Sequence, residues 1–126
     1  HRFQYHSDKP LDVHRMEAAA AYLVGTHDFA SFCGNRKMKK STVRTIYEIK
    51  ITGSGPDIAI DYRGSGFLQN MVRILTGTLI EVGDGRLSPS AIPEILAARD
   101  RAAAGYTAPA CGLTLMEVEY GEEKEN

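Results

Sequence analysis

The segment from Phe67 to Ile80 constrains the fold more than any other, because its fourteen residues have helical apolar spacing and carry a single charge, Arg73. Apolar residues recur at steps of three and four, which predicts one stripe of an amphipathic helix. The members of this stripe are Leu68, Met71, Val72, Leu75, Leu79 and Val82.

Arg73 lies off the apolar stripe. At about 100° per residue it falls on a second face of the predicted helix, shared with Gly66, Asn70 and Gly77. Isoleucines flank this second face as well, so we expect the helix to be buried over most of its circumference. A buried guanidinium is tolerated only when an anion pairs with it. The sequence therefore predicts an anion beside Arg73, on a face where glycines leave room for a close approach.

Length and composition indicate one globular domain over residues 1–126, with 43% hydrophobic and 25% charged residues. No apolar run reaches the roughly 18 residues that span a bilayer, so we expect a cytoplasmic protein without a membrane partner. Cys33 and Cys111 lie far apart, which favours free thiols over a disulfide or a metal site. The chain begins at His1 without a methionine, and we expect it to be part of a longer protein.

Periodicity predicts an α+β fold with a mainly antiparallel sheet, helices packed on one face, and an open second face where function should lie. The first helix is expected over 11–24, a non-periodic functional loop over 26–43, and a β-hairpin over 44–63 that turns at 53–57. A third helix should begin after Ser88, and a last strand should run over 112–120. In the hairpin, we expect Tyr47, Ile49 and Ile51 to share the apolar side.

Three features are candidates for function, and each has a structural interpretation beside it. Leu113 shares a strand face with glutamates. It is either part of a contact surface or an ordinary exposed leucine. His27 and Asp28 form either an acid–base pair or, as favoured here, a structural pair. A basic cluster is either a solvated loop or, with Phe29 and Phe32 just before it, a surface for phosphates and unpaired bases. The cluster consists of Arg36, Lys37, Lys39, Lys40 and Arg44. No spacing of ligands predicts a metal.

Four blocks in order resemble the TruA-type tRNA pseudouridine synthases, and specifically their C-terminal half. They are Gly25-Thr26-His27-Asp28-Phe29-Ala30-Ser31-Phe32, Arg44-Thr45-Ile46, the stretch from Gly66 through Met71-Val72-Arg73 to Gly83, and Thr107-Ala108-Pro109-Ala110-Cys111-Gly112-Leu113.

The resemblance implies half of a pseudouridine synthase fold and the isomerisation of uridine to pseudouridine in the tRNA anticodon stem-loop, by a homodimer without cofactor. It implies a catalytic aspartate in an Arg-Thr-Asp motif of the N-terminal half. This chain lacks that motif, because Ile46 follows Arg44-Thr45. The chain should therefore be inactive by itself, and the N-terminal half is an expected partner.

The same resemblance assigns roles to single residues. Arg73 would pair with the missing aspartate, and Leu113 would pack beside the target base, which is flipped into the pocket. The residues implied to lie along the RNA are His27, Asp28, Phe29, Ser31, Phe32, Arg36, Lys37, Lys39, Lys40, Arg44 and Asn70. The chain departs from the family pattern at Ser65, Gln69 and Cys111, whose roles the resemblance leaves open.

Two other functions remain on the sequence alone: a free-standing RNA-binding module, and a small-molecule regulatory domain of ferredoxin-like build. A lone buried cation argues against both, because a module complete in itself has no use for one. In the isolated chain we expect Arg73 to reach solvent, a bound anion, or a substitute partner such as Asp61 or Asp28.

Overall fold

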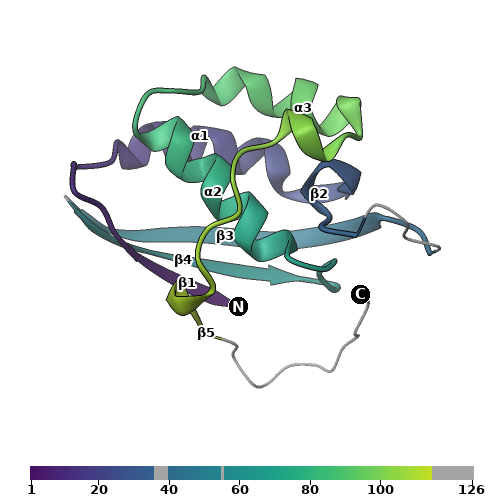
Figure 1. Cartoon of the computed structure of the whole chain (residues 1–126), viewed down its shortest axis with the longest axis horizontal. Coiled ribbons are helices and arrows are strands. Elements are labelled where there is room, and N and C mark those ends of the chain that lie inside the picture. Colours follow the sequence, from purple (N-terminus) through teal and green to yellow (C-terminus); the bar gives the residue numbers. More distant parts are fainter. Residues whose placement is uncertain (36–39, 55, 115–126) are drawn as a thin grey trace.

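The computed structural model describes residues 1–35, 40–54 and 56–114, with the backbone alone for Ser54, Leu113 and Thr114. An antiparallel sheet in the order β2-β3-β4-β1-β5 forms one layer, and helices cover one of its faces (Figure 1). The strands are β1 (Arg2–His6), β2 (Gly25–Asp28), β3 (Val43–Ser54), β4 (Asp57–Gly64) and β5 (Leu113–Thr114). The helices are α1 (Val13–Leu23), α2 (Met71–Gly83) and α3 (Ile92–Ala98), with 3₁₀ turns η1 (Ala30–Phe32), η2 (Pro89–Ala91), η3 (Arg101–Ala103) and η4 (Ala110–Gly112). The expected α+β class is confirmed.

The β3–β4 hairpin forms where alternation predicted it, but one strand is irregular. A β-bulge between Ile46 and Glu48 shifts the register, and Ile46 is buried while Tyr47 is 56% exposed. The expectation that Tyr47 would share the apolar side is therefore wrong, because the extra residue of the bulge turns it outward. Ile51 does face the core, opposite Ile60 of β4.

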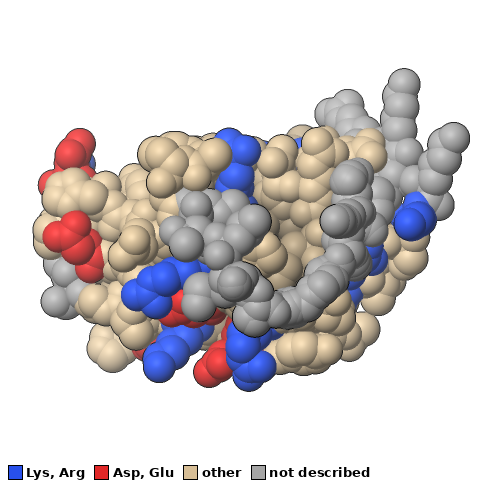
Figure 2. All heavy atoms as spheres, turned by 90° about the horizontal axis from the view of Figure 1, so that it is seen from below, with Lys and Arg blue, Asp and Glu red and all other residues tan. Residues whose placement is uncertain are grey.

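The open face of the sheet carries charges that are already paired across neighbouring strands. Arg2 holds Asp61 with nitrogen–oxygen distances of 2.8 and 3.0 Å, and Arg63 lies 3.2 Å from Glu48. At the hairpin end, His6 Nδ1 lies 2.7 Å from Asp57, whose hydrogen bond and charge raise the pKa of the histidine. Figure 2 views the molecule from this side and shows basic and acidic side chains next to one another.

Helix α2 is the centre of the core. Of its 13 residues, all are buried except Arg73 and Glu81. The helix begins at Met71 and not at Phe67, because Asn70 has a left-handed backbone with φ of 61° and a tight turn precedes it. Burial around most of the circumference is thus confirmed, and Gly66 and Asn70 lie before the helix instead of on its second face.

The other helices also follow their sequence signals. The Asp12 side chain accepts the backbone N–H of Arg15 at the start of α1, as an N-cap residue should. Ser88 caps a 3₁₀ turn, η2, that leads directly into α3. In the described part of the chain, no helix is long and apolar enough to cross a membrane.

Two regions near the N-terminus differ from expectation. Residues 2–6 form β1, a strand not predicted from the sequence, which pairs with both β4 and β5. The segment 26–43 is not wholly irregular, because it contains the end of β2 and the turn η1.

The last strand is described only for Leu113 and Thr114. The rest of the predicted strand, to residue 120, lies outside the described residues.

Candidate active site

Arg73 is the third residue of α2 and is half-buried in the first turn of that helix. Its Nε donates to the carbonyl oxygen of Ala108 at 2.8 Å, and Nη1 donates to Oδ1 of Asn70 at 3.3 Å. Both acceptors are neutral. Among the described residues, no carboxylate lies within ion-pair distance of Arg73.

The position of Arg73 within α2 is electrostatically unusual. The N-terminal end of a helix carries a partial positive charge, which favours an anion and disfavours a cation. The first turn of α2 contains no acidic residue, and Asn70 provides no side-chain cap. The helix end and the guanidinium therefore both attract an anion from outside this part of the chain.

The glycine on the second face of α2 does admit a close neighbour, and that neighbour is the chain itself. A Cβ placed on Gly77 would lie 1.8 Å from the backbone oxygen of Tyr106. The extended segment that holds Tyr106 continues to Ala108, whose N–H donates to the carbonyl of Arg73 at 3.0 Å. Part of the space expected for a ligand is thus filled by backbone.

The two carboxylates suggested as substitute partners of Arg73 are engaged elsewhere, so that alternative is wrong, whereas the half-buried guanidinium does reach solvent, the first of the expected alternatives. Asp61 pairs with Arg2 on the open face. Asp28 accepts from the Thr42 hydroxyl at 2.5 Å and from the Ala30 N–H at 3.1 Å, and lies 3.7 Å from Arg99.

Leu113 is placed by its backbone. It pairs with Phe3 at the start of β5, and Gly112 before it lies so close to β1 that a Cβ there would be 2.5 Å from the Gln4 carbonyl. The Leu113 side chain lies outside the described residues, so the expectation that it opens onto the same site as Arg73 stays a prediction. The short segment from Ala108 to Leu113 connects the two residues predicted to be catalytic.

The block from His27 to Phe32 has a structural role in this chain. Phe29 and Phe32 are fully buried, with their ring centroids 6.2 Å apart. The expectation that these rings stack on bases is wrong in this conformation, because they fill the core.

Ser31 is also fully buried and donates to the Ile95 carbonyl at 2.6 Å. No hydrogen bond joins His27 to Asp28, and the imidazole contacts the backbone oxygen of Val24 at 3.0 Å.

The basic cluster follows this block. Arg36, Lys37 and Lys39 lie outside the described residues. Lys40 is exposed, and Arg44 donates from Nη1 to the carbonyls of Ser41 and Val43, both at 2.8 Å.

The segment that leads into the cluster lies beside the start of α2. The Gly34 N–H donates to the carbonyl of Gln69 at 2.8 Å, and a Cβ on Gly34 would lie 3.0 Å from the Asn70 side chain. Gly34, which precedes the basic cluster in the sequence, thus lies at the same end of α2 as Arg73. Of the positions that depart from the family pattern, Ser65 accepts from the Thr45 N–H at 3.1 Å, and Cys111 is exposed.

Sequence reasoning missed the importance of Ala108 and of the segment before it. The signal that could have indicated this segment is the pair of small residues, Gly77 on the helix and Gly105 on the loop, since close backbone contact requires glycine on both sides.

The described part of the chain is thus an open-faced α+β domain with an arginine at a helix start, where the guanidinium meets only neutral acceptors. Comparison with known proteins gives the same class a name. A family model described as tRNA pseudouridine synthase matches residues 19–121, and the chain belongs to this family.

Curated relatives agree with the family assignment. The chain is 52% identical over 120 residues to tRNA pseudouridine synthase A of Brevibacillus brevis, an alignment that covers 95% of this chain and 49% of the relative. It is 49% identical over 116 residues to tRNA pseudouridine synthase A of Geotalea uraniireducens, covering 92% and 48%. It is 48% identical over 118 residues to tRNA pseudouridine synthase A 1 of Bacillus cereus, covering 94% and 48%. The chain thus spans about half the length of these relatives.

Proposed function

We propose that the chain is the C-terminal half of a tRNA pseudouridine synthase that isomerises uridine in the anticodon stem-loop. The enzyme's aspartate comes from the N-terminal half and binds beside Arg73. The full-length protein acts in the cytoplasm as a homodimer and without a cofactor. The segment 34–40 and the open face of the sheet contact the RNA.

The observation that carries this proposal is the state of Arg73. Its guanidinium is half-buried at the positive end of α2 and hydrogen-bonded only to neutral acceptors in the described chain. An arginine in such a place is costly unless an anion binds there, and a carboxylate from elsewhere would supply that anion. A paired arginine would in turn keep that carboxylate ionised and oriented.

Arg73 has the donors that this role requires. A guanidinium carries five N–H groups, of which Ala108 and Asn70 take one each. The remaining groups allow a bidentate contact with a carboxylate, the geometry that fixes both position and charge. The ionised aspartate can then act on the uridine. Its N1–C1′ glycosidic bond is broken, C5 forms the new bond to C1′ and loses its proton to solvent, and N1 gains a proton.

The experiment measures release of tritium from C5-labelled uridine in tRNA. The protein from the complete coding sequence should release tritium, whereas residues 1–126 alone should release none above background. Mixing this chain with a separately produced N-terminal half should restore release. Turnover by residues 1–126 alone would contradict the proposal, because a catalytic group would then lie within this chain.

A further inference from the structure

The segment Gly105–Ala108, here called the strap, lies along the second face of α2 (Figure 1). Three of its backbone N–H groups donate hydrogen bonds to residues of α2. Gly105 donates to Thr78 Oγ1 at 2.9 Å, Tyr106 donates to Glu81 Oε2 at 3.2 Å, and Ala108 donates to the carbonyl of Arg73 at 3.0 Å. The strap is thus attached at three points, and the last of them is the candidate catalytic arginine.

The strap and α2 are in backbone contact. A Cβ on Gly77 would meet the Tyr106 carbonyl oxygen, and a Cβ on Gly105 would lie 2.8 Å from Cα of Thr78. Ala108 itself is fully buried. Contacts of this kind have little freedom to shift, because backbone atoms cannot rotate away as a side chain can.

Arg101 clamps the strap from its other side. From η3, its Nη1 donates to the Gly105 carbonyl at 2.8 Å and its Nη2 donates to Thr107 Oγ1 at 3.0 Å. The planar guanidinium thus joins two strap residues in a fixed fork geometry, which a lysine cannot reproduce.

The turn that carries Arg101 is itself anchored in the core. The backbone N–H of Asp100 donates to the hydroxyl of the buried Ser31 at 2.9 Å, and the same hydroxyl donates to the Ile95 carbonyl. A continuous series of hydrogen bonds therefore runs from Ser31 through η3 and Arg101 to the strap, and from the strap to Arg73.

We propose that Arg101 is a positioning residue for catalysis: it fixes the strap, and the strap carbonyl of Ala108 fixes the guanidinium of Arg73 toward its carboxylate. This inference rests on the proposed function of Arg73. Arg101 need not contact substrate, because the two acceptors of its guanidinium belong to the strap. Loosening the strap leaves Arg73 in place and charged but turns its free donors away from the aspartate.

The test uses charge-conserving variants of the full-length enzyme, so that attraction to tRNA is unchanged. Arg101→Lys loses the fork and should lower kcat about tenfold with KM nearly unchanged. Arg99→Lys is the matched control, since Arg99 is exposed two residues away and has no hydrogen bond to the strap among the described contacts. It should keep the kcat of the unaltered enzyme. Thr107→Val removes one acceptor of the fork and should give a smaller loss of kcat.

The pH profile separates positioning from a general structural effect. A poorly oriented Arg73 depresses the pKa of the aspartate less, so the acid limb of kcat should move to higher pH in Arg101→Lys and stay in place in Arg99→Lys. An unchanged kcat and acid limb in both Arg101→Lys and Thr107→Val would overturn the inference. If Arg73→Ala abolishes turnover in the same assay, the proposed function survives that result. If Arg73→Ala retains turnover, both proposals fail together.

Discussion

The two ends of α2 handle charge in opposite ways. At the C-terminal end, where a cation is favoured, Arg15 of α1 donates to the carbonyls of Val82 and Leu87 at 2.9 and 2.8 Å. At the N-terminal end, where a cation is disfavoured, the helix has Arg73 and no acidic residue in its first turn.

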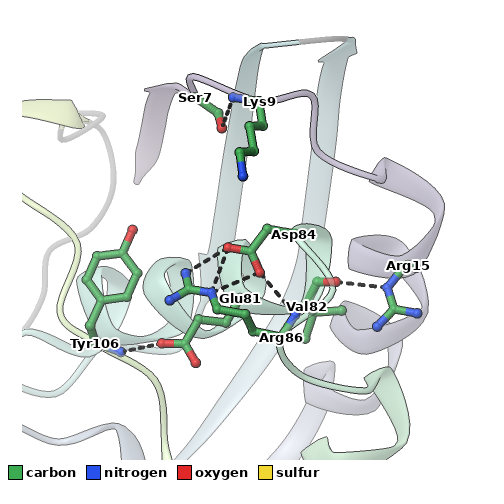
Figure 3. A network of polar contacts seen from close by, with 8 residues as sticks. All are labelled: Ser7, Lys9, Arg15, Glu81, Val82, Asp84, Arg86 and Tyr106. Carbon is green, nitrogen blue, oxygen red and sulfur yellow. Dashed lines mark hydrogen bonds and ion pairs between the residues drawn. The ribbon is translucent and has the colours of Figure 1, made fainter.

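The same contrast holds for the neighbouring charges. Just beyond the C-terminal end, Arg86 binds Asp84 with distances of 2.7 to 3.1 Å, and Glu81 accepts the N–H of Tyr106 (Figure 3). The charges at one end of the helix are thus matched within the chain, whereas at the other end no anion accompanies the arginine among the described residues. A charge that its own helix opposes is therefore a more specific signal for a candidate functional site than charge alone.

The largest effect is expected at the N-terminal end of α2, where Arg73 lies. Arg73→Ala in the full-length enzyme should lower kcat by about a thousandfold, the order of effect seen when a group that stabilises charge in an active site is removed. The free energy of unfolding should change by no more than about 1 kcal/mol, because the substitution also removes a cation from the positive end of a helix. Tritium release and chemical denaturation measure the two quantities. Near-normal turnover would show that Arg73 is a structural residue.

A second prediction compares the cost of an added methyl group at two glycines of α2, one against the strap and one at the C-terminal end. Gly77→Ala should destabilise the fold by about 3 kcal/mol, because the new methyl group meets the fixed carbonyl of Tyr106. Gly83→Ala should cost about 1 kcal/mol or less, since its nearest neighbour is the flexible Met16 side chain, with Sδ 2.7 Å away. Denaturant unfolding of both variants gives the difference. Equal costs would mean that the strap yields as easily as a methionine side chain.

The third prediction removes the arginine that donates to carbonyl groups at the C-terminal end of α2. Arg15→Ala should lower the free energy of unfolding by about 2 kcal/mol, because two partly buried carbonyls lose a charged donor. Turnover per folded molecule should stay the same, in contrast to Arg73→Ala. Arg2→Ala is the matched control. It should lower the free energy of unfolding less, because its partner Asp61 lies on the open face and remains accessible to water. A loss of kcat in Arg15→Ala at full folding would show that the two ends are coupled.

How far the sequence predicted this arrangement depends on the range of the contacts. The hairpin and α2 were predicted because period-2 and period-3.6 patterns are local. Strand β1 was missed because it has five residues and its partners in β4 lie more than 50 positions later. The bulge that exposes Tyr47 adds one residue to an otherwise regular alternation, and no local pattern marks it.

The candidate site shows the same limit. The angular position of Arg73 off the apolar stripe was available from the sequence, and so was the need for an anion. The contact that fills the glycine face was not, because glycine admits a ligand or a backbone equally well. Burial of Phe29 and Phe32 was also hidden, since aromatic residues beside cations are typical of both a core edge and an RNA surface.

The fourth prediction asks which end of α2 faces the RNA. Lys40→Glu, in the basic cluster that follows Gly34 in the sequence, should weaken tRNA binding several-fold at low salt and reduce the salt slope by about one. Adding Lys39→Glu should weaken binding further. Arg86→Glu makes the same charge change at the C-terminal end and should leave affinity and slope nearly unchanged. Filter binding over a salt series compares the variants, and equal losses in both would show that only net charge matters.

The smallest expected effect concerns pH at the C-terminal end of α2. Burial raises the pKa of Asp84, but the hydrogen bonds and charge of Arg86 outweigh it and hold the pKa below its usual value. A carboxyl group with a lowered pKa in the folded state adds stability at pH values above its unfolded pKa of about 4, and this contribution is lost as the pH falls through the folded pKa. Asp84→Asn should therefore cost about 0.5 kcal/mol at pH 7, since Arg86 is largely exposed and solvent screens the pair. The difference from the unaltered protein should shrink as the pH falls through the folded-state pKa of Asp84. A gap that persists in acid would show that Asp84 stabilises the helix end by its hydrogen bonds alone, independent of its charge.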